Sequence, residues 1–148
     1  MESSDQPARV LVVANRTAAT PALLAAVKER AERGPARFTL LVPNTSSGVE
    51  RFADPEDHAD TEAQNTLERA LPLLEEASGS EVTGMVGAPE PMDAIQDAVN
   101  LHGFDEIILS TLPKRVSRWL HLDLPSKLNV LGLPVTTITA SGRAERVA

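Results

Sequence analysis

Four basic residues stand close together in the last third of the chain. Lys114, Arg115, Arg118 and Lys127 fall between positions 111 and 127, and Asp123 is the one acidic residue among them, although the whole chain carries a formal net charge of −7. Arginine binds phosphate or carboxylate through a planar fork and lysine binds it as a point charge. The stretch is therefore a candidate anion site, and the alternative is a surface loop with solvated charges and a Trp119 that packs between helix and sheet.

Other site chemistries have little support in the sequence. The absence of cysteine excludes disulfides and thiolate catalysis, and His58, His102 and His121 lie too far apart to show metal-ligand spacing. No Ser-His-Asp arrangement or paired-carboxylate motif is readable, and the acids of residues 57–76 fit a solvated helix face. We expect no catalytic residue, no metal site and no enzymatic activity, with a weak ATPase as the remaining enzymatic alternative.

Length and composition indicate one domain. The chain has 148 residues, of which 42% are hydrophobic and 24% charged, as in ordinary globular proteins. A pI near 4.9 argues against nucleic acid as a partner. No apolar run reaches the roughly 18 residues of a membrane span, so we expect a soluble, cytoplasmic protein. We expect a disordered lead-in over residues 1–8, an α/β domain over 9–140 and a polar tail over 141–148.

Apolar runs and helical stripes alternate along the chain. This alternation predicts a single doubly wound α/β domain, with a five-stranded parallel sheet and four flanking helices. Pro72 should kink or split the second helix. In such folds ligands bind beyond the carboxyl ends of the strands. The predicted strands are residues 10–14, 38–42, 81–86, 106–109 and 135–139, and the predicted helices are 21–33, 57–78, 92–102 and 126–131.

The order of these elements is similar to that of the universal stress protein family, a branch of the adenine-nucleotide α-hydrolase-like superfold. The resemblance rests on the frame VLVVANRT, FTLLVP, VGAPEPMDAI, DEIILST and GLPVTTI. It implies strand order 3-2-1-4-5, with Asn15 and Ser110 as neighbours and the Val42 backbone at the family's adenine position. The candidate nucleotide- or anion-binding residues are Asn15, Arg16, Val42, Ser110, Thr111, Lys114, Arg115, Ser117 and Arg118.

ATP-binding members of that family carry G-x2-G-x9-G-[ST] after the fourth strand, and this chain keeps only the spacing. Ser110 and Pro113 fall at the first two glycines, Asp123 at the third, and Leu124 at the Ser/Thr. Pro113 has no N–H to donate to a phosphate, and Leu124 has no hydroxyl. A carboxylate 4 Å from a phosphate charge is repelled by about 4 kcal/mol at an effective dielectric of about 20. We therefore expect no ATP binding in the family's usual way.

Two functions follow from this resemblance. The first is a non-enzymatic regulatory or interaction module without a cofactor, dimeric through its last strand, Val135–Thr139, as the family often is. The alternative is a sensor that binds a nucleotide or another phosphorylated anion at the loop after the fourth strand. Ser117 would then cap the turn that follows it, and Lys114, Arg115 and Arg118 would supply the positive charge.

Overall fold

The computed structural model describes residues 7–14, 18–44, 58–88, 90–111, 118–121, 123–139 and 144–147. Within these ranges, the side chains of residues 58–62, 118, 121 and 144–147 are outside the description. The candidate residues Asn15, Arg16, Lys114, Arg115 and Ser117 fall outside the described residues.

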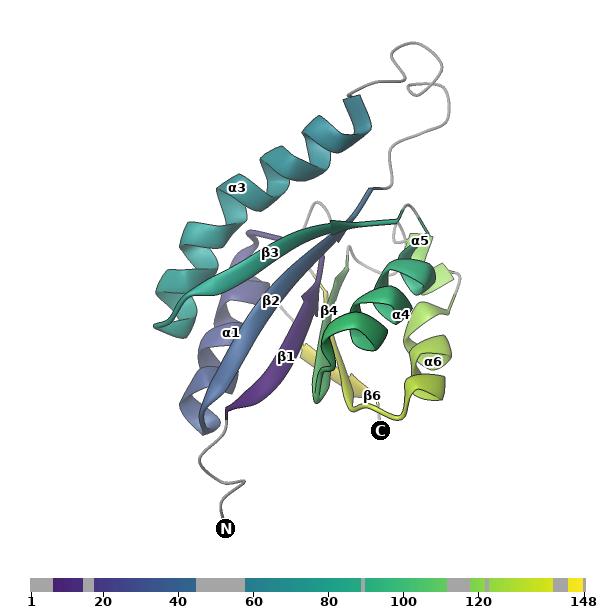
Figure 1. The fold of residues 1–148 in the computed structure, drawn as a ribbon. Coiled ribbons are helices and arrows are strands. Elements are labelled where there is room, and N and C mark those ends of the chain that lie inside the picture. The colour runs from purple at the N-terminus through teal and green to yellow at the C-terminus, as the bar shows by residue number, and fades with distance from the viewer. Residues whose placement is uncertain are drawn as a thin grey trace.

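A single sheet forms the centre of the molecule (Figure 1). Its strands follow the order β3-β2-β1-β4-β5-β6, and the first five are parallel, which confirms the predicted order 3-2-1-4-5. Val12 of β1 lies between Leu40 of β2 and Ile108 of β4. The strands are β1 (Ala8–Val13), β2 (Ala36–Pro43), β3 (Val82–Gly87), β4 (Glu106–Thr111), β5 (Val135–Thr139) and β6 (Ala144–Val147).

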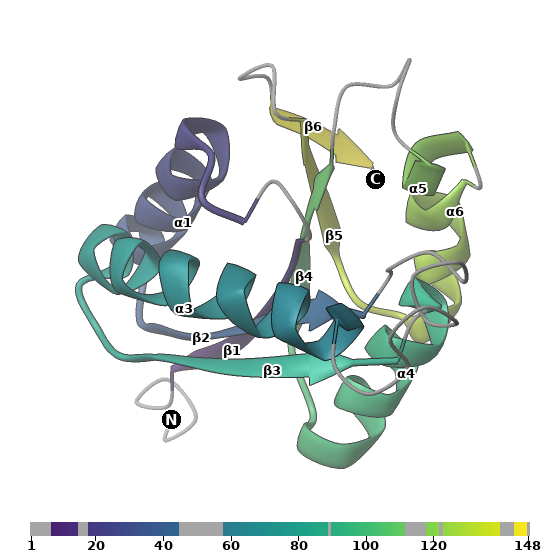
Figure 2. The ribbon, with the colours of Figure 1, turned by 90° about the horizontal axis from the view of Figure 1, so that it is seen from above.

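Helices cover both faces of the sheet, as predicted for a doubly wound fold (Figure 2). One layer consists of α1 (Pro21–Arg33) and α3 (His58–Ser78). The other contains α4 (Pro91–His102), α5 (Arg118–His121), α6 (Leu124–Leu128) and the 3-10 turn η2 (Asn129–Leu131). The fourth predicted helix corresponds to α6 and η2. Pro72 does not split α3, which runs on both sides of it.

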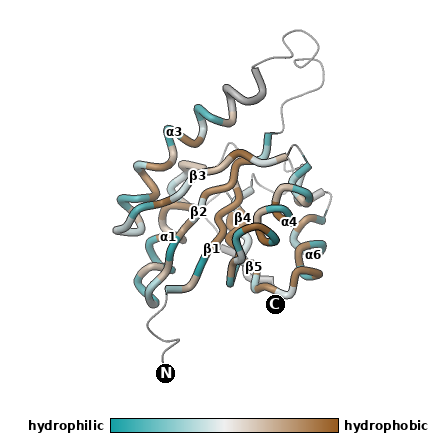
Figure 3. Tube along the Cα trace, in the orientation of Figure 1, coloured by the Kyte–Doolittle hydropathy of each residue, from teal (hydrophilic) through white to brown (hydrophobic). Residues whose placement is uncertain are grey.

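The core divides into two apolar layers because side chains alternate across each strand. Val10 and Val12 face α1 and α3, whereas Leu11 and Val13 face α4 and α6. All four are fully buried, as expected for a central parallel strand with helices on both faces. The central strands β1 and β4 are consequently largely hydrophobic (Figure 3).

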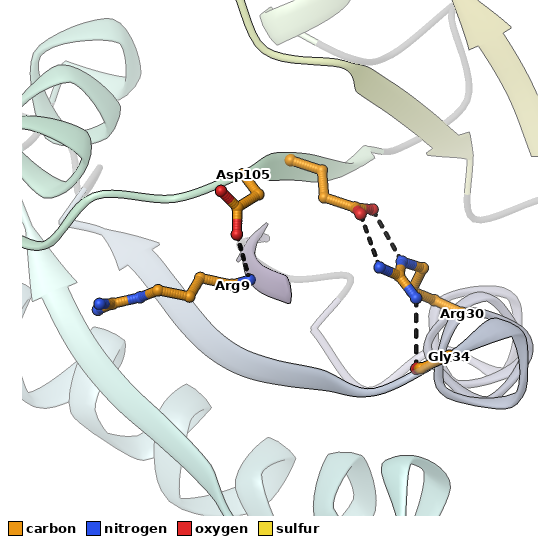
Figure 4. A network of polar contacts seen from close by, with 5 residues as sticks. Arg9, Arg30, Gly34 and Asp105 are labelled. Carbon is orange, nitrogen blue, oxygen red and sulfur yellow. Dashed lines mark hydrogen bonds and ion pairs between the residues drawn. The ribbon is translucent and has the colours of Figure 1, made fainter. Parts of the chain in front are cut away.

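Charged contacts join the elements at the amino end of the sheet (Figure 4). The Arg30 guanidinium on α1 donates to both carboxylate oxygens of Glu106 on β4, at 2.8 and 2.9 Å. Hydrogen bonding to Glu106 raises the pKa of Arg30 above its usual range. Asp105 accepts a hydrogen bond from the Arg9 backbone N–H at 2.8 Å. These contacts lie at the opposite end of the sheet from the candidate residues Ser110 and Thr111, which end β4.

The sixth strand was not predicted. Residues 141–148 were expected to form a polar tail, but β6 lies within this segment and pairs antiparallel with β5. The outer edge of β5, where a second copy was expected to bind, is therefore paired within the chain. Across the described part of the chain, no helix is both long enough and apolar enough to cross a membrane.

Candidate functional site

The carboxyl ends of β1 and β4 lie side by side, at the point where the strand order reverses. Val13 of β1 is paired with Leu109 of β4, so the next residues in each strand direction are Ala14 and Ser110. Ser110 and Thr111 are buried, with 1% and 2% of their surface exposed. This is the end of the sheet at which ligands bind in doubly wound folds.

Three of the nine candidate residues have described side chains. Val42, Ser110 and Thr111 all lie at this end of the sheet, on β2 and β4. Val42 is 1% exposed and packs in the α1–α3 layer, so its side chain belongs to the core. Arg118 begins α5, and its side chain is outside the description.

Gly87 is a close-contact position that the sequence reading did not single out. A Cβ on Gly87 would lie 2.8 Å from the Cβ of Ala94 and 2.8 Å from the Cδ1 of Leu41. The start of α4 therefore packs directly against the sheet. The Asn44 backbone N–H donates to the Gly87 carbonyl at 3.1 Å, which joins the ends of β2 and β3. The Gly-Ala-Pro sequence after an apolar strand is the signal that marks this turn.

Three threonines lie on the α4–α6 side of the sheet at the carboxyl ends of β4 and β5. Thr111 is the register partner of Thr139, and Thr137 lies two residues earlier on the same face. All three side chains are buried. The Oγ1 atoms of Thr111 and Thr137 have no hydrogen-bond partner within the described part of the chain. Thr137 was not a candidate residue, although the sequence VTTIT places its hydroxyl at a core-facing strand position.

Asp123 adopts a backbone conformation that normally favours glycine. Its φ of 61° and ψ of 40° lie in the left-handed region, and no other non-glycine residue of the described ranges has a positive φ. Its N–H donates to the Leu120 carbonyl at 3.0 Å, and its own carbonyl accepts from the Lys127 N–H at 3.1 Å. The side chain is exposed and makes no capping bond to α6. Asp123 falls at the third-glycine position of the family motif, and its left-handed backbone is one that glycine would adopt without strain.

Leu124, the next residue, belongs to the hydrophobic core. It is the first residue of α6, is 3% exposed and packs in the same layer as Trp119 and Leu128. Trp119 is 8% exposed, which agrees with its expected place between helix and sheet. The position at which the family motif carries a phosphate-binding hydroxyl is therefore occupied here by a buried apolar side chain.

The described residues of this region contain no cluster of metal-ligand side chains. In the ranges that the structure describes, no group of three or more histidine, aspartate or glutamate residues is placed to hold a metal ion. The described residues do offer buried hydroxyls on β4 and β5, and the sequence after β4 contains the basic residues Lys114, Arg115 and Arg118.

The strand order and the helices on both faces define a doubly wound α/β protein. The solved structures to which the chain is similar include a universal stress protein from Archaeoglobus fulgidus, at 20% identity and a TM-score of 0.64 over 88% of this chain and 93% of that one. A structure of a universal stress protein from Archaeoglobus fulgidus in complex with dAMP matches at 18% identity and a TM-score of 0.60, over 90% of this chain and 98% of that one. A universal stress protein in complex with cAMP matches at 14% identity and a TM-score of 0.56, over 89% and 97%.

The chain thus has the fold of the universal stress proteins, which confirms the resemblance at the level of fold. No protein-family model matches the sequence, and no curated protein matches it.

Proposed function

We propose that this protein is a non-enzymatic regulatory or interaction module that does not bind ATP through the family's glycine-rich motif. On the same resemblance, we assign it to the cytoplasm and to a stress-type response. The proposal follows from the fold taken together with the residues at the motif positions.

The burial of Leu124 carries the argument. A serine or threonine at this position would present a hydroxyl to a phosphate, but Leu124 is 3% exposed and contributes to the α4–α6 layer. Exposing the Leu124 side chain would cost about 25 cal/mol for each Å² of apolar surface that leaves the core. The exposed carboxylate of Asp123 adds a negative charge immediately before it, which disfavours a triphosphate.

A thermal-shift titration with ATP tests this proposal. A ligand present at 100 times its dissociation constant stabilises a fold by about 2.7 kcal/mol. For a domain of this size that corresponds to a rise in Tm of about 5–10 °C. We expect no rise at millimolar ATP with Mg²⁺. A saturable rise that is unchanged in the Asp123→Asn variant would show that the motif argument is wrong.

The buried hydroxyl of Thr111 favours a second candidate function, a sensor for a small phosphorylated anion. A hydroxyl without a partner costs about 1–3 kcal/mol when buried, and a polar ligand or a water would offset that cost. Thr111 ends β4, and three basic residues follow it within seven positions. Side-chain donors from Lys114, Arg115 and Arg118 would replace the backbone donors that the family motif provides.

A charge-matched pair of double variants tests the sensor. The screen uses AMP, cyclic AMP and inorganic phosphate, each measured by the shift in Tm and then by calorimetry. If one of them binds, Arg115→Ala with Arg118→Ala should weaken it at least tenfold. Arg33→Ala with Arg37→Ala removes the same charge at the far, amino end of the sheet and should leave binding within about twofold. Equal losses in both double variants would indicate a general charge effect and no site.

A further inference from the structure

The antiparallel strand β6 occupies the sheet edge that the five-stranded parallel fold would leave open. Four residue pairs join it to β5, from Val135 with Val147 to Ile138 with Ala144. Figure 2 shows β6 beyond β5 at the end of the sheet, with α1 on one side and α5 and α6 on the other. Backbone pairing by this strand is therefore what covers the β5 edge in the described structure.

β5 has the composition of a strand that associates readily when its edge is open. All five of its residues are β-branched and none is charged. Uncovered edges of this kind pair with other chains, and proteins protect them with short or charged strands. β6 is short and contains Glu145 and Arg146. It has the features of a protective edge strand.

We propose that β6 is an intramolecular cover of the association edge, and that a second copy of the chain, pairing through its own β5, is the alternative occupant. This inference rests on the dimer expected through Val135–Thr139. β6 already shows that the edge accepts an antiparallel strand. Two copies of β5 related by a twofold axis would also meet antiparallel, and each would cover the other.

The two occupants compete for one row of backbone donors and acceptors. Four residues separate β5 from β6 in the sequence, and a short link of this kind gives an effective concentration on the order of millimolar. For strands of equal pairing strength, a second copy at micromolar concentration is disfavoured about a thousandfold. The intact chain is therefore monomeric at micromolar concentration and associates as its concentration approaches the millimolar range.

Adjacent proline substitutions in the full chain test the proposal. Successive residues of a strand point their N–H groups to opposite sides, so one of Glu145 and Arg146 directs its N–H at β5 and the other directs it outward. Glu145→Pro and Arg146→Pro therefore form a matched pair, of which one removes a ladder hydrogen bond and the other does not. Sedimentation at 10–100 micromolar should show a dimer for one variant, with association strengthened by up to about a thousandfold, and a monomer for the other.

Three results in this assay would overturn the proposal. They are a dimeric parent protein at the same concentrations, two monomeric variants, and two variants that dimerise equally. A far-ultraviolet circular dichroism spectrum establishes that each variant is folded. Hydrogen exchange adds a local readout, because the amides of β5 should be protected in the dimer although β6 is displaced.

A disulfide lock supplies a second test that does not depend on proline. The chain has no cysteine, so Thr136→Cys with Arg146→Cys introduces one pair of register partners. Opposed Cα atoms of antiparallel strands are about 4.5–5.5 Å apart, within the range that disulfides span. The oxidised protein should stay monomeric at high concentration and should regain association on reduction. A covalent dimer would show that β6 is exchanged between chains, and unchanged association after locking would show that the edge is not used. ATP titration of the same proteins is independent of both results and tests the proposed function separately.

Discussion

Replacing Asp123 is expected to separate the backbone demand of this turn from the chemistry of its side chain. The left-handed conformation at φ 61° costs an L-residue about 1–2 kcal/mol, and aspartate is among the residues that tolerate it best. Asp123→Gly removes that cost but gives the unfolded chain about 0.4–1 kcal/mol of additional conformational freedom. The two effects nearly cancel, with a net gain of about 0.5 kcal/mol. Asp123→Ala keeps the left-handed backbone but lacks the polar side chain that makes it tolerable, and should lower the free energy of unfolding by about 1 kcal/mol.

The informative quantity is the difference between the glycine and alanine variants at the same position. We expect Asp123→Gly to be more stable than Asp123→Ala by about 1–1.5 kcal/mol, or about 2–6 °C in Tm. No capping bond is lost in either variant, because the Asp123 side chain makes none. Urea unfolding of both variants, fitted with a common slope, measures the difference.

Asp93 provides the matched control. It is an exposed aspartate in the first turn of α4, where the backbone is helical and alanine is favoured over glycine by about 1 kcal/mol. The order of stability should therefore reverse: alanine above glycine at 93, and glycine above alanine at 123. If alanine equals or exceeds glycine at 123, the turn does not require a left-handed residue, and the interpretation of this position as a retained glycine site fails.

Three further substitutions have expected effects on stability. Leu124→Ser should cost about 2–5 kcal/mol in urea unfolding and bring no ATP-dependent rise in Tm, whereas Leu101→Ser, at a side chain that is 75% exposed, should stay within about 0.5 kcal/mol. Thr137→Val should raise the free energy of unfolding by about 1 kcal/mol because it removes a buried hydroxyl that has no partner among the described residues, and a loss of stability would instead reveal that the hydroxyl is bonded. A double-mutant cycle of Arg30→Gln and Glu106→Gln should give a coupling of about 1 kcal/mol, reduced by the partial exposure of the pair. Because the pKa of Arg30 is higher in the folded protein than in the unfolded chain, the stability it adds is complete below the unfolded-state pKa and is lost only as the pH rises through the folded-state pKa. The Arg30 contribution to the free energy of unfolding should therefore not change between pH 6 and 10.

Periodicity and composition were sufficient to predict the parallel sheet, because the signals for its strands are local. Val10 to Val13 form a continuous apolar run, and a run of this kind is stable as a strand only when helices cover both of its faces. β6 has no such signal. Glu145 and Arg146 interrupt any apolar pattern, and the strand exists because β5 offers an open row of backbone groups. A tertiary requirement of this kind is invisible to a reading of local sequence.

For the candidate site, the sequence predicted where the motif positions fall, but not which of their side chains are buried. The spacing from Ser110 placed Asp123 at the third glycine of the family motif, and the left-handed backbone of Asp123 became visible only in the structure. The roles of Leu124 and Thr137 required the structure, because burial depends on which residues α5 and α6 bring against the sheet. A leucine between Asp123 and Pro125 is equally compatible with a loop and with the core.

Asp123 and Leu124 explain why the motif spacing occurs in this chain without the motif residues. The Asp123 N–H bonds to Leu120 at the end of α5, and its carbonyl accepts from Lys127 in α6, so the left-handed residue connects the two short helices. That connection directs Leu124 into the core beside Trp119. The turn therefore has a structural role that does not depend on a bound phosphate. The motif spacing at this position therefore coincides with a turn that the fold itself requires, and Leu124 after it packs in the core.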